Sequence, residues 1–270
     1  METNSIQKEI DRLDGVQAWN HNFELPDGLV TSKVAQKSHG KNIVKYNRIQ
    51  HVLDKLNLEG KKVLDMGCNE GFFSLKMEER GASVVGIDID EHRIEKANFI
   101  KELLKPKAKI EFKNLDIYSQ EFQDSDKFNL CLCLGFIHRV PDPFKAVSAL
   151  ASKADIIIFE WKALKFGSHD DSFAYFSSKD IDHKDYYGTE YWLLTYRSLQ
   201  RILERSGFDK FYKIDDPVQN RAIMVAGKIE HEIFDLSNDI KFRNKLMTIL
   251  SHSKRYLKDL TKILSGKINC

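Results

Sequence analysis

The segment VLDMGCNEG, at residues 63–71, combines an acid with a tight glycine turn. An apolar run typical of a buried strand leads into it, and a helical stretch begins near Phe72. Gly67 lets the backbone turn sharply and approach a ligand where a Cβ would collide. The start of the following helix offers free N–H groups and the positive end of its dipole. The segment therefore predicts a ligand-binding turn between a strand and a helix.

Two further acids follow at regular positions. Asp88 ends the run VVGID and lies 23 positions after Asp65, which matches the acid expected about 20 residues onward that accepts hydrogen bonds from ribose hydroxyls. Asp116, in NLDIY, follows the next strand-like run. An acid there can accept from an adenine amino group while Leu115 and Ile117 sandwich the ring.

Strand-like and helical stretches alternate from Lys61 onward, which predicts βαβ units and a parallel sheet. The early strands are short apolar runs without polar alternation, as expected for strands buried on both faces. We expect an α/β fold: a Rossmann-like, doubly wound, mostly parallel seven-stranded sheet with helices on both faces, and an antiparallel last strand. The expected strands are 62–66, 83–88, 109–114, 128–134, 155–160 and 222–227, and the expected helices are 41–56, 72–80, 90–104, 143–153 and 195–206, the last with Thr195 as its N-cap.

VLDMGCNEG, GIDID and NLDIY, at these separations, resemble the three successive cofactor-binding motifs of class I methyltransferases that use S-adenosylmethionine (AdoMet). The resemblance covers roughly residues 61–228. It implies that Asp65 helps to hold the methionine end, Asp88 the ribose and Asp116 the adenine. Asn69 stands where this family usually has glycine, and asparagine is the residue that best tolerates positive φ after glycine. The expected cofactor contacts are Lys45, Asp65, Gly67, Cys68, Asn69, Gly71, Asp88, Ile89, Asp116, Ile117 and Leu134.

Two other readings of the glycine turn stay open. A turn of this kind followed by an acid also suits NAD, although the glycine spacing differs from GxGxxG and Asp116 is an extra acid. A catalytically silent AdoMet-binding module is the second alternative.

A second resemblance concerns the N-terminal part of the chain. WNHNF at 19–23, LPDGLVT at 25–31, KYNR at 45–48 and LGFIHR at 134–139 look like the tRNA wobble-uridine carboxymethyltransferase group and its wider relatives. Members of that group use carboxy-AdoMet, whose extra carboxylate they hold partly through a tyrosine. His138 stands at the tyrosine position and the expected tryptophan is replaced near Gly40, whereas Lys45 is retained. These departures favour plain AdoMet.

The acceptor should lie beyond the carboxyl ends of the strands. His138 follows the fourth strand, where a titratable side chain would face the methyl group, and it is the candidate general base for transfer to a hydroxyl. Contact without proton transfer is the alternative, because alignment alone often governs methyl transfer. The other expected acceptor contacts are Trp19, His21, Arg139, Glu160, Trp161, Trp192 and Arg221.

We expect three regions: a helical and loop preamble (1–60) covering the cofactor site, the AdoMet-binding domain (61–228) and a basic helical tail (229–270). An insert at 163–191, dense in histidine, aspartate and aromatic residues, predicts a lid or acceptor wall. No spacing there completes a metal site, so no metal is expected. Residues 241–270 carry eight basic side chains against one acid. They predict either contact with an anionic surface, lipid or RNA, or a helix packed on the body or another subunit.

Composition sets the remaining expectations. Charged residues make up 30% and hydrophobic residues 42% of the 270, a globular profile with no apolar run of membrane-spanning length. The four cysteines form no disulfide or zinc pattern and the N-terminus has no apolar core, so a cytoplasmic location is expected. The sequence thus predicts an AdoMet-dependent methyltransferase acting on a small-molecule or sugar-like acceptor, at oxygen. Modification of tRNA uridine is the alternative, and the oligomeric state is left open.

Overall fold

The computed structural model describes residues 3–31, 36–163, 174–176, 192–214, 221–228 and 231–234. Contacts divide the chain into two compact units, Met1–Glu230 and His231–Cys270. Only the short turn Glu232–Phe234 represents the second unit, so the fold below is that of the first. The predicted basic tail and most of the predicted insert lie outside the described residues.

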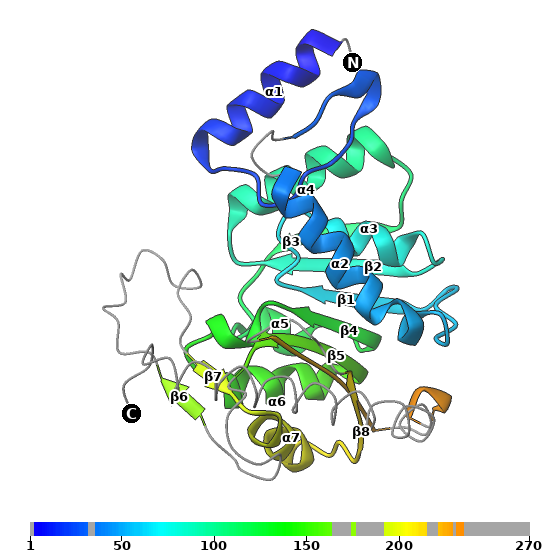
Figure 1. The fold of residues 1–270 in the computed structure, drawn as a ribbon, viewed down its shortest axis with the longest axis vertical. Helices are drawn as coiled ribbons and strands as arrows, with labels where there is room; N and C mark the ends of the chain where they lie inside the picture. The colour runs from blue at the N-terminus through cyan, green and yellow to red at the C-terminus, as the bar shows by residue number, and fades with distance from the viewer. Residues whose placement is uncertain are drawn as a thin grey trace, which may run out of the picture. The chain divides into compact units, whose positions relative to one another are not determined.

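Seven strands form one sheet in the order β3-β2-β1-β4-β5-β9-β8 (Figure 1). The first five pair in parallel and β9 is antiparallel to both neighbours. This arrangement confirms the predicted doubly wound sheet and its antiparallel last strand. The strands are β1 (Lys62–Met66), β2 (Ser83–Asp88), β3 (Ile110–Asn114), β4 (Phe128–Leu134), β5 (Ala154–Lys162), β8 (Lys210–Ile214) and β9 (Arg221–Gly227).

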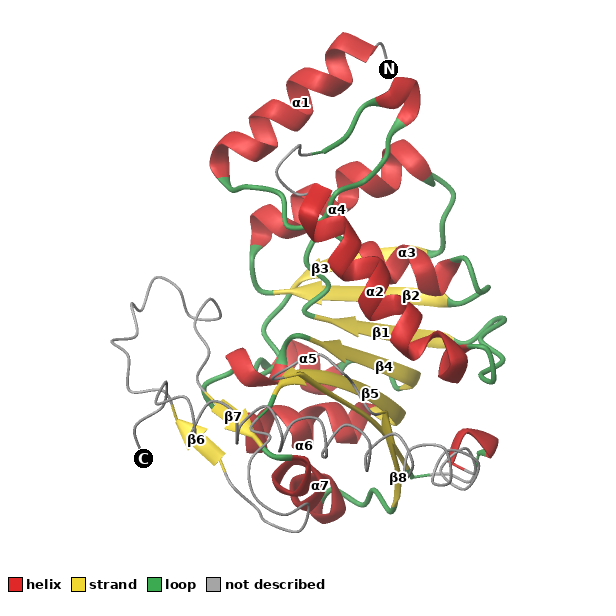
Figure 2. Cartoon of the chain, in the orientation of Figure 1, coloured by secondary structure: helices red, strands yellow, loops and turns green. Residues whose placement is uncertain are grey.

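Helices link the strands, and α2 crosses the near face of the sheet in Figure 2. The helices are α1 (Thr3–Val16), α2 (Gln36–Leu53), α3 (Phe72–Glu78), α4 (Glu91–Leu104), α5 (Gln120–Asp124), α6 (Pro143–Lys153) and α7 (Tyr196–Arg205). Short turns η1 (Pro26–Gly28) and η2 (Ile137–Arg139) and a small pair of strands, β6 (Ala174–Phe176) and β7 (Trp192–Leu194), complete the described elements. Among the described residues, no helix is both long and apolar enough to cross a membrane.

Strand alternation assigns each side chain to one of two faces. On one face, Leu64 and Met66 of β1 pack into the largely apolar core that contains α5, α6 and α7 residues. Asp65, between them, points to the opposite face and meets Ser74 of α3. Glu160 of β5 likewise alternates with Phe159 and Trp161, which belong to the core. The polar side chains of the candidate site therefore lie on the face of α2 and α3.

The N-terminal segment is docked on α4. Arg12 of α1 donates to Glu95 at 2.6 Å, and His92 Nε2 lies 2.8 Å from the carbonyl oxygen of Leu13. Apolar side chains of α1, Ile6 and Ile10 among them, are buried beneath it. The N-terminal helix thus packs on α4, and the covering of the cofactor site by residues 1–60 stays a prediction.

Several element boundaries differ from the sequence prediction. The helix expected at 41–56 is α2, Gln36–Leu53, and the chain beyond it forms turns. The sequence analysis named no strand at 210–214, where β8 forms the sheet edge. KFYKI is short and only partly apolar, and its side chains are alternately half-buried, so its composition gives a weak strand signal. Thr195 caps α7 as predicted: its hydroxyl accepts a hydrogen bond from the Ser198 amide at 3.2 Å.

Candidate functional site

The turn after β1 is pinned to the neighbouring strand. The amides of Gly67 and Cys68 both donate to the carbonyl oxygen of Ile87, at 2.8 and 2.9 Å. Gly67 has φ 70°, and a Cβ there would lie 2.8 Å from Cδ2 of Phe136. Glycine is thus required because the chain's own Phe136, from the loop after β4, approaches this backbone. The sequence alone predicts a ligand in the place that Phe136 occupies.

Asn69 occupies the left-handed region with φ 52°, as predicted for the residue that replaces the usual glycine. Its amide donates to Asp88 Oδ2 at 2.9 Å. Its side-chain Oδ1 is buried and has no hydrogen-bond partner among the described residues. Buried polar atoms are nearly always satisfied, so this oxygen is available to a ligand donor. Gly71, with φ 81°, ends the turn and starts α3.

Asp88 lies against this turn at the end of β2. Its second oxygen accepts from the Asp90 amide at 3.1 Å, and burial raises the pKa of its carboxyl. The next loop is close by, because the Leu115 amide donates to the Asp88 carbonyl oxygen at 3.1 Å. Asp116 is half-buried there, and its Oδ1 accepts from the Tyr118 amide at 2.9 Å. The loops after β1, β2 and β3 thus meet at one edge of the sheet, as the sequence predicted.

Asp65 lies deeper than the other two acids. It is 2% exposed, and its Oδ2 accepts a hydrogen bond from Ser74 Oγ at 2.6 Å. Burial raises its pKa to about 6, an effect that the Ser74 hydrogen bond opposes. The contact with Ser74 ties β1 to α3 directly behind the glycine turn. A role for Asp65 at the methionine end of the cofactor stays a prediction.

Glu70 is a member of the same turn that the sequence analysis did not single out. It is fully buried, and its two carboxylate oxygens accept hydrogen bonds from the amides of Asn20 and His21, at 2.8 and 2.6 Å. Burial raises its pKa to about 7. An acid between asparagine and glycine in a loop looks solvent-exposed in sequence, so only its position inside the motif could have drawn attention to it.

A charged cluster lies near the end of β5 and the start of β9. Glu160 is 1% exposed, and its oxygens lie 3.2 Å from Lys45 Nζ and 3.4 Å from Arg221 Nη1. Lys45 comes from α2 and Arg221 from the start of β9, so three elements meet here. Two basic side chains thus flank one buried carboxylate. We call these three residues the Glu160 cluster.

His138, in η2, lies near this cluster. The ring is 1% exposed, and burial, followed by the nearby Arg221 and Arg139, lowers its pKa to about 2. Nδ1 accepts from the Lys162 amide at 3.4 Å, so in the neutral ring the proton is on Nε2. Nε2 is buried and has no hydrogen-bond partner among the described residues. This geometry makes Nε2 a donor, and the prediction of a general base at His138 finds no support in it.

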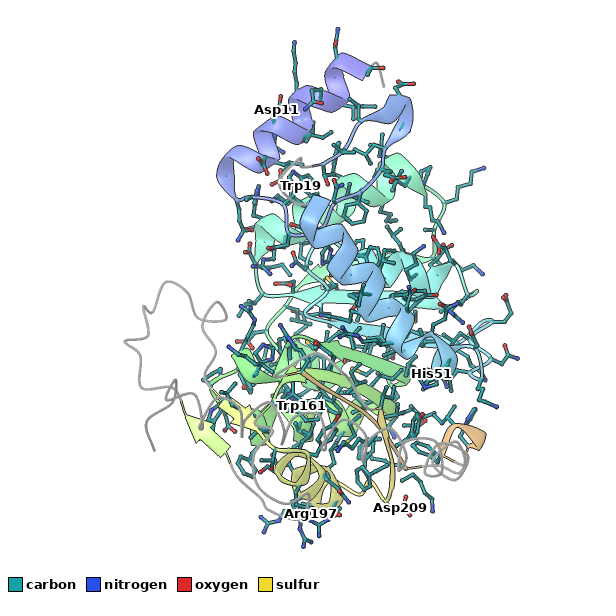
Figure 3. The ribbon with its side chains drawn as sticks, in the orientation of Figure 1. Asp11, Trp19, His51, Trp161, Arg197 and Asp209 are labelled. Atoms are coloured by element: carbon teal, nitrogen blue, oxygen red, sulfur yellow. The ribbon has the colours of Figure 1, made fainter. Side chains whose placement is uncertain are left out.

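The three tryptophans are not gathered at the cluster. Trp161 is fully buried in the core on the other face of β5, where its Nε1 donates to the Leu194 carbonyl oxygen at 2.9 Å (Figure 3). Its predicted place beside the acceptor is therefore wrong, because residues 160 and 161 of a strand face opposite sides. Trp192 is half-buried and donates to the Pro141 carbonyl oxygen at 2.9 Å, against the loop after β4.

Trp19 lies between α1 and α4 (Figure 3). Its ring is 4.8 Å from Lys96 Nζ, and its Nε1 donates to the Ile10 carbonyl oxygen at 3.5 Å. These contacts are packing contacts of the N-terminal segment and give no support to the predicted acceptor contact.

The remaining predicted residues take varied places. Ile117 is buried in the core, Cys68 is buried within the turn after β1, and Leu134 is buried at the end of β4. Ile89 is exposed at 37%. His21 is buried against Phe72, and Arg139 is half-buried in η2. The predicted cofactor contacts of Cys68, Ile89, Ile117 and Leu134 stay predictions.

Comparison with known proteins gives these positions a context. The profile of the family described as "Methyltransferase domain" matches residues 57–184, which include all three acidic loops. The matched part of the chain is a class I AdoMet-dependent methyltransferase domain. The seven-stranded sheet, with its antiparallel β9, is the fold expected of that class. AdoMet is therefore the cofactor of the domain.

The described residues fit this cofactor. Asp88 presents carboxylate oxygens beside the glycine turn, and the buried Oδ1 of Asn69 lacks a partner among the described residues. Bound AdoMet supplies an electrophilic methyl group on its sulfonium. Asn69 and Asp88, at the glycine turn, are the residues of the chain that would hold the nucleoside.

Curated relatives match only part of the chain. The ubiquinone biosynthesis O-methyltransferase of Stutzerimonas stutzeri (strain A1501) is 31% identical over 105 residues, which are 39% of this chain and 44% of the relative. That of Dechloromonas aromatica (strain RCB) is 33% identical over 104 residues, covering 38% and 44%. The chain thus spans less than half the length of the curated relatives that it matches.

Solved structures match more of the chain at lower identity. The N-terminal domain of EvdMO1, crystallised in the presence of SAH and D-fucose, is 18% identical with a TM-score of 0.62, covering 85% of this chain and 98% of that one. Magnesium protoporphyrin IX methyltransferase from Synechocystis PCC 6803, with bound SAM, is 22% identical with a TM-score of 0.53 and the same coverage. These likenesses establish the fold.

Proposed function

We propose that the protein transfers the methyl group of AdoMet to a hydroxyl oxygen of a small-molecule or sugar-like acceptor. Support comes from the relatives named as O-methyltransferases and from the structural neighbour crystallised with D-fucose. The observation that supports the acceptor side is the Glu160 cluster, because it brings charged groups from α2, β5 and β9 together at one place.

Each group of the cluster has a distinct role in this proposal. Glu160 accepts hydrogen bonds from acceptor hydroxyls, and Lys45 and Arg221 hold its carboxylate in place through the two ion pairs. His138 donates from Nε2 to an acceptor oxygen. Proton removal is not its main contribution, because burial holds the pKa of the ring near 2. Methyl transfer then depends chiefly on alignment of the hydroxyl with the methyl group.

The pairing of Lys45 also bears on the form of the cofactor. To bind the extra carboxylate of carboxy-AdoMet, the cation at this position must not already be paired with another carboxylate. Here Lys45 Nζ already lies 3.2 Å from a carboxylate oxygen of the chain's own Glu160. This pairing supports plain AdoMet over carboxy-AdoMet, and with it a small acceptor over tRNA uridine.

The proposal is tested by mass spectrometry of a panel of phenols, catechols and deoxysugars incubated with the protein and AdoMet. A mass gain of one methyl group at a hydroxyl is the expected result. Transfer only with carboxy-AdoMet and tRNA would contradict the proposal, and so would AdoMet binding without turnover on any acceptor.

Arg221→Ala then tests the cluster. We expect KM for the acceptor to rise at least tenfold, about 1.4 kcal/mol, because Glu160 loses a cation and its position. AdoMet affinity should stay within about twofold. Arg201→Ala, on the exposed face of α7, is the matched control and should behave as the parent protein. An unchanged acceptor KM in Arg221→Ala would remove the cluster from the acceptor site.

A further inference from the structure

The N-terminal segment and the cofactor turn are joined through one buried side chain. Glu70 stands in the turn between Asn69, whose amide donates to Asp88, and Gly71, which starts α3. Its two oxygens receive the amides of Asn20 and His21 and have no exposed surface. A carboxylate is thus used here to hold backbone that lies 50 residues earlier in the chain.

Positive groups around Glu70 partly offset the burial of its carboxylate. Lys96 of α4 is fully buried, and its Nζ lies 3.9 Å from Glu70 Oε1. The same ammonium group donates to the Gln17 carbonyl oxygen and lies over the Trp19 ring. His21 Nδ1 is 3.6 Å from Oε2, and Arg93 adds positive potential. Residues 17–21 are therefore held from two directions, by the turn and by α4.

The segment beyond His21 is held less directly. Thr31 donates to the His21 carbonyl oxygen and accepts from the Phe23 amide, both at 3.0 Å. The His21 ring packs edge-on against Phe72, the first residue of α3. Movement of the turn would therefore displace the segment, and release of the segment would remove both backbone donors from the Glu70 carboxylate.

We infer that Glu70 is a positioning residue for the cofactor: its carboxylate clamps Asn20 and His21 to the glycine turn, so that the docked N-terminal segment and bound AdoMet stabilise each other. Glu70 itself touches no reacting group in this account. Coupling of this kind is reciprocal, so AdoMet tightens the clamp as much as the clamp tightens AdoMet binding.

Glu70→Gln tests the clamp with little change in volume. Glutamine offers one accepting oxygen, and its NH₂ group faces the second backbone N–H, so one of the two hydrogen bonds is lost. We expect faster hydrogen exchange across residues 17–23 and AdoMet affinity about tenfold weaker by calorimetry. Neither readout requires an acceptor, so failure of the proposed hydroxyl transfer leaves this test intact.

Glu91→Gln, exposed at the start of α4, is the matched control and should leave both readouts at the parent values. In the parent protein, AdoMet should slow exchange across residues 17–23, a measurement that stands even where Glu70→Gln folds poorly. Faster exchange in Glu70→Gln with unchanged AdoMet affinity would reduce Glu70 to a structural residue and overturn the inference. Exchange in the parent protein that does not respond to AdoMet would overturn it as well.

Discussion

Burial sets the protonation of the residues that surround the cofactor turn. It raises the pKa of Asp65 to about 6 and lowers that of His138 to about 2, because removal from water disfavours the charged form of either group. The His138 ring is therefore neutral. Its Nε2–H has no hydrogen-bond partner among the described residues. The residue most easily recognised in sequence as a base is therefore better suited to donate a hydrogen bond.

His138→Gln tests that protonation state. The folded pKa lies below the unfolded value near 6.5, so the stability that the neutral ring contributes is present above pH 6.5 and lost as pH falls. Between pH 7 and pH 5 the parent protein should lose about 2 kcal/mol through this group, and His138→Gln should lose that much less. Urea unfolding at the two pH values measures the difference. Equal losses in both proteins would mean that His138 takes up a proton in the folded state.

Gly67→Ala tests why glycine stands at the turn. Alanine at φ 70° is strained, and its Cβ would lie 2.8 Å from the Phe136 ring. We expect unfolding free energy to fall by about 2 kcal/mol, measured by chemical denaturation. A Cβ at Gly15, in α1, would meet nothing within 4 Å, so Gly15→Ala should be neutral or slightly stabilising. The outcome against this account is equal stability of the two variants.

The sequence predicts a residue well when its backbone conformation depends only on its own type and its neighbours in the chain. The positive φ of Asn69 followed from its chemistry and its place in the motif. The sequence does not predict a residue whose surroundings come from a distant part of the chain. Glu70 is the example, because its partners are the amides of Asn20 and His21. The sequence prediction also failed for Trp161, although strand alternation with Glu160 would have assigned the ring to the core.

At the scale of elements, the caps and turns determine where helices begin. Asp90, Ser119, Asp142 and Thr195 each accept a backbone N–H at the start of a helix. Strands β1, β2 and β4 matched their expected bounds because buried parallel strands are mostly apolar. Edge strand β8 lacks such an apolar run. It pairs with only one strand, β9, so fewer of its positions must be apolar.

Thr195→Ala tests the cap of α7. The Thr195 hydroxyl accepts from the Ser198 amide, and its removal should lower unfolding free energy by about 1 kcal/mol. Thr195→Ser keeps the acceptor and should retain most of that free energy. Urea denaturation compares the three proteins. If Thr195→Ser loses as much as Thr195→Ala, methyl packing rather than capping explains the contribution.

At the scale of the whole molecule, the order of strands brings the functional loops together. Strands β1, β2 and β3 are neighbours, so the loops that follow them share one edge of the sheet. Strand β4 pairs with β5, and β5 pairs with β9, so Glu160 and Arg221 of the Glu160 cluster lie on the neighbouring strands of the same sheet. This much could be predicted from alternating strands and helices. The docking of α1 on α4 could not, because it rests on contacts such as Arg12–Glu95 that no local pattern encodes.

Calorimetric titration of the chain with AdoMet, with S-adenosylhomocysteine and with NAD tests the central claim most directly. The account predicts saturable one-to-one binding of the first two and none of NAD. Asp88→Ala should bind AdoMet more weakly by about 1.5–3 kcal/mol, because charge-assisted hydrogen bonds to the ribose are lost. Binding of NAD in place of AdoMet, or an Asp88→Ala variant with parental AdoMet affinity, would contradict the account.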